Sequence, residues 1–167
     1  FSADHGLAVG HHGLFGKQNL YEHSTRVPFI AVGPGIAAGA KNDAPIYLQD
    51  VHPTTLELAG AKPADKVEFH SLLPMLKGKS KQHAYDAIHG AYLGLQRSVT
   101  VEGWKLILYP NVSKARLYNI PADPLEMTDL AHDAKQEKRI SILFARMLKL
   151  QKEMDDKLDL KKSFPKL

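Results

Sequence analysis

The 167-residue sequence contains no cysteine, so no disulfide can form within it. It has no apolar run near the roughly 18 residues that a membrane-spanning helix requires, and no internal repeat. Lysine and arginine number 22 against 18 acidic residues, which gives a net charge of +4. Aromatic residues are not interleaved with the basic ones, so the pattern argues against nucleic-acid binding. The absence of a long apolar run argues against a membrane span.

The length allows either one domain with its own hydrophobic core or a piece of a larger domain. The first residue is Phe1 rather than methionine, and residues 1–3 have the pattern of a strand already under way. We therefore expect a fragment whose upstream part is missing.

The first 28 residues combine a carboxylate, several imidazoles, an isolated lysine and several glycines, with almost no helical or strand periodicity. Glycines at positions 6, 10, 13 and 16 allow backbone conformations and close approaches that side chains would block. This composition is typical of a binding or catalytic loop on a rigid scaffold.

Asp4 and His5 could reach one metal ion if the backbone turns at Gly6. A carboxylate suits calcium or magnesium and an imidazole suits zinc or manganese, so the pair alone does not choose the metal. A turn-capping aspartate beside a surface histidine is the alternative. His11 and His12 are adjacent and lack the i, i+4 spacing of a helical zinc site.

Lys17 follows Gly16 and precedes a short polar segment, residues 18–24, that is predicted to be helical. A lysine presented by a glycine can hold an anion as a point charge. A solvated surface lysine is the alternative interpretation.

Ten runs occur in order along about three quarters of the chain: Phe1–Gly6, Gly10–Lys17, Leu20–Glu22, Arg26–Ile30, Gly33–Ile36, Asp50–Gly60, Ser71–Gly78, Leu117–Ile120, Asp123–Glu126 and Asp129–Ala131. Together they resemble the second half of a sulfatase catalytic domain, in the alkaline phosphatase superfamily.

The resemblance implies an α/β fold. Its parts are the C-terminal part of an alkaline-phosphatase-like mixed sheet with flanking helices, a small antiparallel sheet and a long C-terminal helix. Residues 1–82 would be the C-terminal portion of the sulfatase catalytic domain, and residues 83–167 a small C-terminal α+β subdomain.

The residues themselves predict several of these elements. The apolar run 27–32 predicts a buried strand, and residues 1–3 would end another one at the carboxyl edge of a parallel sheet, where such sheets place ligands. Asp50 is predicted to be the N-cap of a helix through residue 59, which is a structural role, and residues 72–76 are predicted to be helical.

Four short segments separated by turn residues, 84–93, 96–101, 104–109 and 116–120, predict an antiparallel meander. Apolar residues at three- and four-residue steps predict an amphipathic helix over 136–157, folded onto its own domain or bound to a partner. Two roles are open for Arg97: its side chain could approach the active site, or it could form a structural ion pair.

By the resemblance, Asp4 and His5 match the family's second pair of metal ligands, where many members have asparagine in place of the histidine and the metal is usually calcium. Lys17 matches the lysine that contacts the sulfate and its leaving-group oxygen, and His12 is placed near the substrate. Tyr21 and Glu22 are expected to hold the loop.

The implied activity is hydrolysis of a sulfuric ester of a small molecule or sulfated glycan. A divalent cation and a fixed lysine would stabilise the charge that develops on the sulfate and the leaving oxygen. The family's formylglycine nucleophile, made from a Cys/Ser-x-Pro-x-Arg motif, and an upstream Asp pair are expected in the missing N-terminal half. The chain contains neither, so alone it is expected to be inactive.

Two alternatives stay open: a phosphodiesterase or phosphonate monoester hydrolase of the same superfamily, and a non-catalytic remnant. The family resemblance also implies export to the periplasm or the extracellular space.

Overall fold

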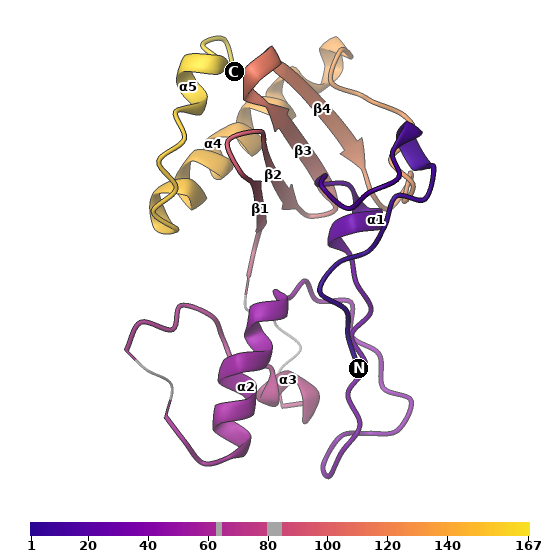
Figure 1. Ribbon diagram of the computed structural model, residues 1–167, viewed down its shortest axis with the longest axis vertical. Helices are drawn as coiled ribbons and strands as arrows, with labels where there is room; N and C mark the ends of the chain where they lie inside the picture. Colours follow the sequence, from indigo (N-terminus) through magenta and orange to yellow (C-terminus); the bar gives the residue numbers. More distant parts are fainter. Residues whose placement is uncertain (63–64, 80–84) are drawn as a thin grey trace. The chain divides into compact units, whose positions relative to one another are not determined.

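The computed structural model describes residues 1–62, 65–79 and 85–167. The chain forms two compact units (Figure 1), of which unit 1 comprises Phe1–Asp4 and Pro28–Asp86 and unit 2 comprises His5–Val27 and Ala87–Leu167. The segment 5–27, which carries most of the candidate site residues, therefore belongs to the unit that the C-terminal half builds. The predicted domain boundary between residues 82 and 83 lies outside the described residues and stays a prediction.

Unit 2 is built on a four-stranded antiparallel sheet with the strand order β1-β2-β3-β4. Its strands are β1 Ile88–Tyr92, β2 Gln96–Val101, β3 Trp104–Tyr109 and β4 Lys114–Asn119. Glu102 and Gly103, both with positive φ, form the tight turn between β2 and β3, which matches the twist of neighbouring strands. The predicted meander is confirmed, although residue 84, where its first segment was expected to begin, lies outside the described residues.

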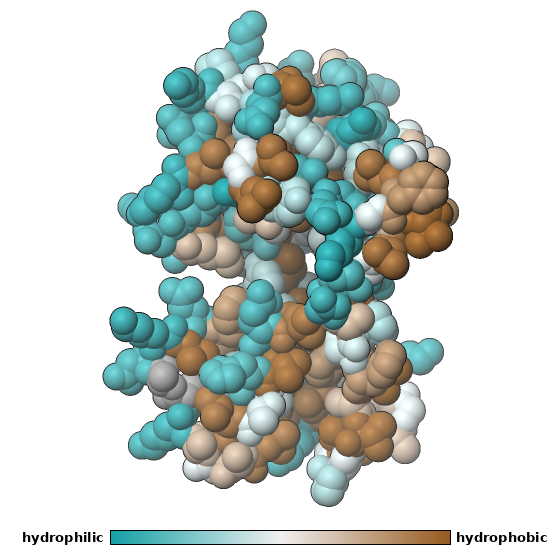
Figure 2. All heavy atoms as spheres, viewed as in Figure 1, coloured by the Kyte–Doolittle hydropathy of each residue, from teal (hydrophilic) through white to brown (hydrophobic). Residues whose placement is uncertain are grey.

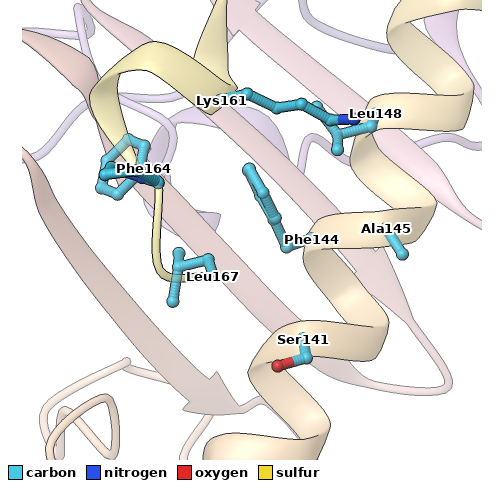
Figure 3. A pocket seen from close by; sticks show the side chains of 8 residues that line it. Ser141, Phe144, Ala145, Leu148, Lys161, Phe164 and Leu167 are labelled. Carbon is cyan, nitrogen blue, oxygen red and sulfur yellow. The ribbon is translucent and has the colours of Figure 1, made fainter.

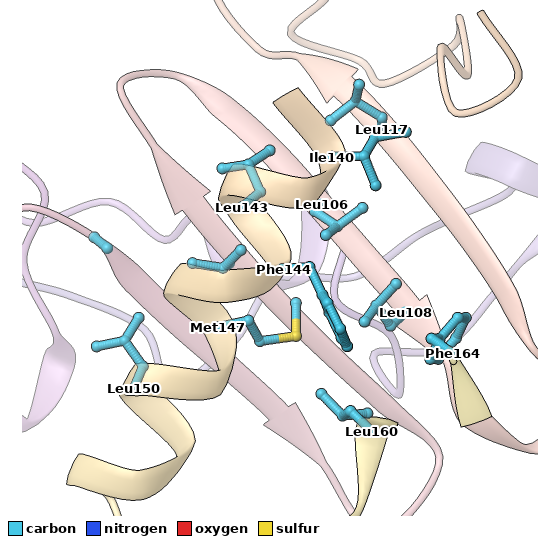
Figure 4. Close-up of a cluster of buried hydrophobic side chains, with 12 residues drawn as sticks. Leu106, Leu108, Leu117, Ile140, Leu143, Phe144, Met147, Leu150, Leu160 and Phe164 are labelled. Carbon is cyan, nitrogen blue, oxygen red and sulfur yellow. The ribbon is translucent and has the colours of Figure 1, made fainter. Parts of the chain in front are cut away.

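One face of the sheet packs against the long helix α4, Glu137–Glu153, to form the main hydrophobic core (Figure 4). Side chains alternate along a strand and recur every 3.6 residues along a helix, so both patterns present one apolar surface. The core residues include Val99, Leu106, Leu108, Leu117, Ile140, Leu143, Phe144, Met147 and Leu150. The helix therefore folds onto its own domain.

The helix ends earlier than predicted. Its last residue is Glu153, and Asp155 then takes a left-handed conformation with φ 55°. The Asp156 N–H donates to the Gln151 carbonyl oxygen at 2.8 Å, a bond typical of a helix C-terminus. A short helix, α5, follows at Leu160–Ser163.

The opposite face of the sheet is covered by the segment 5–27, which contains the short helices η1, His11–Gly13, and α1, Glu22–Thr25. Leu20 and Tyr21 pack against Ile107 and Tyr118. The Leu20 N–H also donates to the Gln96 side chain at 3.1 Å. The second face of the sheet is thus a rigid base for the candidate site.

Arg97 forms a structural ion pair. Its guanidinium donates to both carboxylate oxygens of Asp156, at 2.6 and 2.9 Å, and the two side chains are 8% and 15% exposed. This pairing holds the pKa of Asp156 well below its usual range. The contact joins β2 to the chain after α4, so the structural interpretation of Arg97 is confirmed.

Unit 1 contains η2, Leu48–Asp50, α2, Val51–Leu58, and α3, Leu73–Leu76. Asp50 is fully buried, and its carboxylate accepts hydrogen bonds from the Tyr47 N–H at 2.8 Å, the His70 N–H at 3.1 Å and the Tyr85 hydroxyl at 2.5 Å. Asp50 occupies the N-cap position of α2, but its side chain makes no capping bond there. Its carboxylate instead accepts from the Tyr47 N–H at the start of η2. The predicted structural role is therefore right, but the hydrogen bond that provides it differs from the predicted one.

The strands predicted at residues 1–3 and 27–32 do not form in the part of the chain that the structure describes. Ser2 and Phe29 pair at a single isolated bridge, while Phe1 is 83% and Val32 93% exposed. A strand needs a continuous ladder of hydrogen bonds to a neighbour, and one residue pair does not supply it.

Among the described residues, no helix combines the length and the apolar character needed to cross a membrane.

Removing the Asp156 carboxylate should destabilise unit 2 strongly, because it leaves the Arg97 guanidinium buried without its partner. We expect Asp156→Ala to lower the free energy of unfolding by about 3–5 kcal/mol, measured by urea denaturation. The neighbouring variant Asp155→Asn is the control, since Asp155 is 82% exposed and asparagine tolerates its left-handed backbone. Equal midpoints for the two variants would contradict this assignment.

Candidate functional site

Lys17 and His5 contact each other within the segment 5–27. Lys17 Nζ lies 2.6 Å from His5 Nε2, and His5 Nδ1 lies 3.0 Å from the carbonyl oxygen of Gly6. Because a carbonyl oxygen only accepts, Nδ1 carries the proton and Nε2 offers its lone pair. The Lys17 ammonium therefore donates to the imidazole of His5, which brings together two residues predicted for different roles.

Backbone hydrogen bonds hold this loop in shape. The Gly6 N–H donates to the Ser24 carbonyl at 3.0 Å, and the Ala8 N–H donates to the Gly16 carbonyl at 3.1 Å. At Gly6 the chain passes so close to His23 that an added Cβ would lie 2.0 Å from the His23 carbonyl oxygen. Position 6 therefore requires glycine.

His12 lies in the left-handed backbone region, with φ 52°. Its Nε2 is 3.2 Å from the Leu125 carbonyl oxygen, and its ring stacks on Tyr21 with centroids 4.0 Å apart and planes 10° apart. Burial lowers the pKa of His12, so the neutral imidazole donates its Nε2 proton to Leu125 at neutral pH. The turn after β4 thus fixes both the tautomer and the orientation of His12.

Three imidazoles gather around this point. The ring centroids of His11, His12 and His23 are 5.9 to 6.4 Å apart. Burial lowers the pKa of His23, and repulsion from the two other histidines, when they are protonated, and from Lys105 lowers it further. Protonating this cluster is therefore unfavourable in the folded protein.

Asp4 belongs to unit 1 and His5 begins the segment that joins unit 2. The described part of the chain contains no group of three or more histidine, aspartate or glutamate side chains that could hold a metal ion. Asp4 and His5 together offer two donors and remain predicted metal ligands.

A buried ion cluster anchors the loop to the sheet. Lys105 Nζ lies 2.9 Å from Glu22 Oε1 and 3.2 Å from Glu126 Oε1. The Glu22 N–H donates to the Glu126 carboxylate at 2.6 Å. The Lys105 and Glu126 side chains are 2% and 1% exposed. These contacts agree with the expectation that Glu22 holds the loop.

Lys105 and Glu126 were not predicted as part of the site. The signal that could have found Lys105 is its position inside the otherwise apolar run Trp104–Tyr109, because a lysine is rarely buried without an acidic partner. For Glu126 the signal is the Asp-Pro-Leu-Glu run that begins at residue 123, shortly after β4 ends at Asn119.

A separate groove of about 510 Å³ lies between α4 and the C-terminal segment (Figure 3). Its lining is mostly apolar and includes Phe144, Leu148, Phe164 and Leu167, with Lys161 at its side. It contains none of the predicted site residues, so it is distinct from the candidate site.

Comparison with known proteins identifies the family. Residues 10–153 match the family described as N-sulphoglucosamine sulphohydrolase, C-terminal. The chain belongs to this family and is the C-terminal part of a sulfatase, as the sequence motifs predicted.

Two relatives illustrate the similarity. A sulfatase from Formosa agariphila is 30% identical over 154 residues, which cover 92% of this chain and 30% of that relative. A solved structure of a protein in complex with its substrate D-glucosamine-2-N,6-O-disulfate is 28% identical with a TM-score of 0.84, covering 94% of this chain and 34% of that one. The chain thus spans about a third of the length of the proteins it matches.

A phosphonate monoester hydrolase of Agrobacterium radiobacter shares the fold with a TM-score of 0.76 at 22% identity, over 92% of this chain and 34% of that one. The predicted fold class, with its small antiparallel sheet and long C-terminal helix, is confirmed by the sulfatases of the alkaline-phosphatase-like fold among these structures.

The lowered pKa values of His12, His23 and His89, each due first to burial, predict that unit 2 loses stability in acid. The unfolded imidazoles titrate near about 6.5, so the unfolded state takes up protons at a higher pH than the folded state does. Stability is therefore full above about pH 6.5 and falls as the pH drops toward the folded pKa values.

We expect the urea midpoint of the protein to fall between about pH 7.5 and about pH 5.5, and His89→Gln to flatten this dependence. His52→Gln is the control, because His52 is exposed. A pH dependence that is the same in both variants would contradict the assignment to His89.

Proposed function

We propose that this chain supplies part of a sulfatase active site. Lys17 and His12 contact the sulfate ester, and Asp4 and His5 bind a divalent metal, which we take to be calcium. The observation that carries the proposal is the 2.6 Å contact between Lys17 and His5, which holds a cation beside a metal-type ligand in the family's motif.

Lys17 suits the electrostatic demands of the reaction. When a sulfate ester is hydrolysed, the bond to the leaving oxygen breaks and negative charge grows on that oxygen. An ammonium group held in advance can donate a hydrogen bond there without reorganisation, which lowers the barrier. His12, neutral because of its lowered pKa and held by Leu125, would orient the ester beside it.

Asp4 and His5 fit a divalent metal by their donor chemistry. Asp4 offers the carboxylate oxygens that calcium prefers, and His5 offers Nε2 because its Nδ1 proton is engaged by the Gly6 carbonyl. A bound cation would neutralise charge on the sulfate oxygens. Since Nε2 has one lone pair, His5 can serve either Lys17 or a metal, and metal ligation would leave the Lys17 ammonium available to the anion.

The chain would act together with the rest of a catalytic domain that contains the formylglycine nucleophile and the upstream Asp pair. Apolar side chains exposed on residues 7–15 support such packing: Leu7 is 54%, Val9 75% and Phe15 84% exposed. The space-filling view also shows apolar surface in this region (Figure 2). An exported, periplasmic or extracellular enzyme is part of the same proposal.

We propose a sulfated sugar or a small organic sulfate ester as the substrate. The support is the similar structure that holds D-glucosamine-2-N,6-O-disulfate as its substrate. A phosphonate monoester or phosphodiester is the second candidate, favoured by the shared fold of the phosphonate monoester hydrolase.

In the complete enzyme, Lys17→Ala should lower kcat by roughly 10²–10³-fold, as expected for the loss of one donor to the transition state. The assay compares an aryl sulfate with an aryl phosphonate and a phosphate diester, so it also separates the two substrate classes. Lys138→Ala, an exposed lysine on α4, is the control. An unchanged kcat for Lys17→Ala would reject its role, and turnover of the phosphorus esters alone would reject the sulfatase proposal.

The metal role of His5 predicts a graded response to substitution. His5→Ala removes the donor and should raise the calcium concentration needed for half-maximal activity after chelation, because one ligand is lost. His5→Asn keeps an oxygen donor that calcium accepts and should need less calcium than His5→Ala. The same calcium requirement in wild type and His5→Ala would show that His5 does not bind the metal.

A further inference from the structure

We propose that the turn after β4 is a positioning element for the candidate site, and that Glu126, paired with Lys105, sets the placement of His12. This inference rests on the proposed function, because it assigns residues that support the substrate-contacting loop. Glu126 and Lys105 would act through other residues and not touch the substrate.

Two consecutive residues of this turn each hold one residue of the segment 5–27. The Leu125 carbonyl accepts from His12 Nε2 at 3.2 Å, and the Glu126 carboxylate accepts from the Glu22 N–H at 2.6 Å. Glu22 directly follows Tyr21, on whose ring the His12 imidazole stacks at 4.0 Å. The turn therefore holds His12 by its ring nitrogen and, through Tyr21, by its ring face.

The turn is itself well fixed. The Glu126 N–H donates to the Asp123 carbonyl at 3.0 Å, and the Thr128 N–H donates to the Asp123 carboxylate at 2.7 Å. Glu126 adopts φ 56°, a left-handed conformation that is unfavourable for a residue other than glycine. The Glu126 side chain is nevertheless buried in contacts with the loop and the sheet, and such strain is maintained only where the surroundings over-determine it.

Lys105 makes the placement depend on charge. Its ammonium lies between the carboxylates of Glu22 and Glu126, at 2.9 and 3.2 Å. The Lys105 and Glu126 side chains are buried, and Glu22 is 19% exposed. Without Lys105 the two carboxylates would repel each other, and without Glu126 the Glu22 N–H and part of the ammonium would lose their partner. Either change should move Tyr21, and with it His12.

The test uses the complete enzyme with the variants Glu126→Ala and Glu126→Gln. We expect Glu126→Ala to lower kcat by roughly 10- to 100-fold, since small displacements of positioned groups have effects of this size, with little change in KM. Glu126→Gln should lose less, because its amide oxygen can still accept from the Glu22 N–H. The matched control is Glu102→Ala, a glutamate that is exposed and also has positive φ, at 49°.

A second readout follows His12 directly and does not depend on turnover. Diethyl pyrocarbonate modifies neutral imidazoles, and mass spectrometry locates each modified histidine. His12 is partly buried, bonded to Leu125 and stacked on Tyr21, so in wild type we expect it to react more slowly than the exposed His52. Glu126→Ala should remove this protection, with His52 as the internal reference. If Glu126→Ala does not fold, Glu126→Gln gives the same readout with a smaller loss of protection.

A charge-neutral double variant separates positioning from simple stability. Lys105→Met should lower kcat, and Lys105→Met combined with Glu126→Gln should recover part of the loss, because no carboxylate pair is left to repel. Recovery supports the proposal, whereas a double variant as impaired as the sum of its singles opposes it.

The outcomes of this test and of the proposed function are distinguishable. Wild-type enzyme that cleaves no sulfate ester rejects the proposed function, and the His12 modification still tests the positioning role. Unchanged protection of His12 in Glu126→Ala overturns the positioning role, whichever ester the enzyme cleaves. A lowered melting temperature with unchanged kcat and unchanged protection would show that Glu126 has only a structural role.

Discussion

The constraint on which unit 2 depends is the burial of Lys105 on the sheet face that α4 does not cover. A lysine that is 2% exposed must be paired, because an uncompensated charge in a low-dielectric interior is very costly. The partners come from the segment 5–27 and from the turn after β4. Pairing Lys105 on this face therefore requires the loop that carries His12 and Lys17, so we expect folding of unit 2 to place these two residues as well.

The parts of the fold set by local pattern were predictable from the sequence. Apolar residues spaced along 140–150 identified α4, and turn residues such as Glu102 and Gly103 separated the strands of the meander. The prediction of a strand at 27–32 was wrong. An apolar, β-branched run has a high propensity for extended structure, but a strand also needs a neighbouring strand to satisfy its backbone hydrogen bonds. The predicted end of helix α4 was likewise too late. The apolar residues keep their helical spacing beyond Glu153, although the helix ends there and Asp155 turns the backbone.

The site was predictable in its residue types but not in its supports. The motif that carries His5 and Lys17 is local, and the structure brings these two side chains into contact. The residues that hold the loop are separated from it by 83 and 104 positions in the chain, for the pairs Lys105–Glu22 and Glu126–Glu22. Nothing in local periodicity connects such positions, because only the folded sheet brings them together. Asp4 and the metal remain predictions for the same reason, since ligand sets are assembled from distant segments.

The strand that contains Lys105 has a further property. In the run Trp104–Tyr109, Leu106, Ile107 and Leu108 are all fully buried, so both faces of β3 are apolar and hydrophobicity alone would accept a shift of its pairing by one residue. Such a shift would exchange the two faces and turn Lys105 into the core beneath α4, away from both glutamates. Lys105 thus fixes the register of β3. In the observed register its charge is paired with two glutamates, and in the shifted register the same charge would be buried without a partner, at a large cost in free energy.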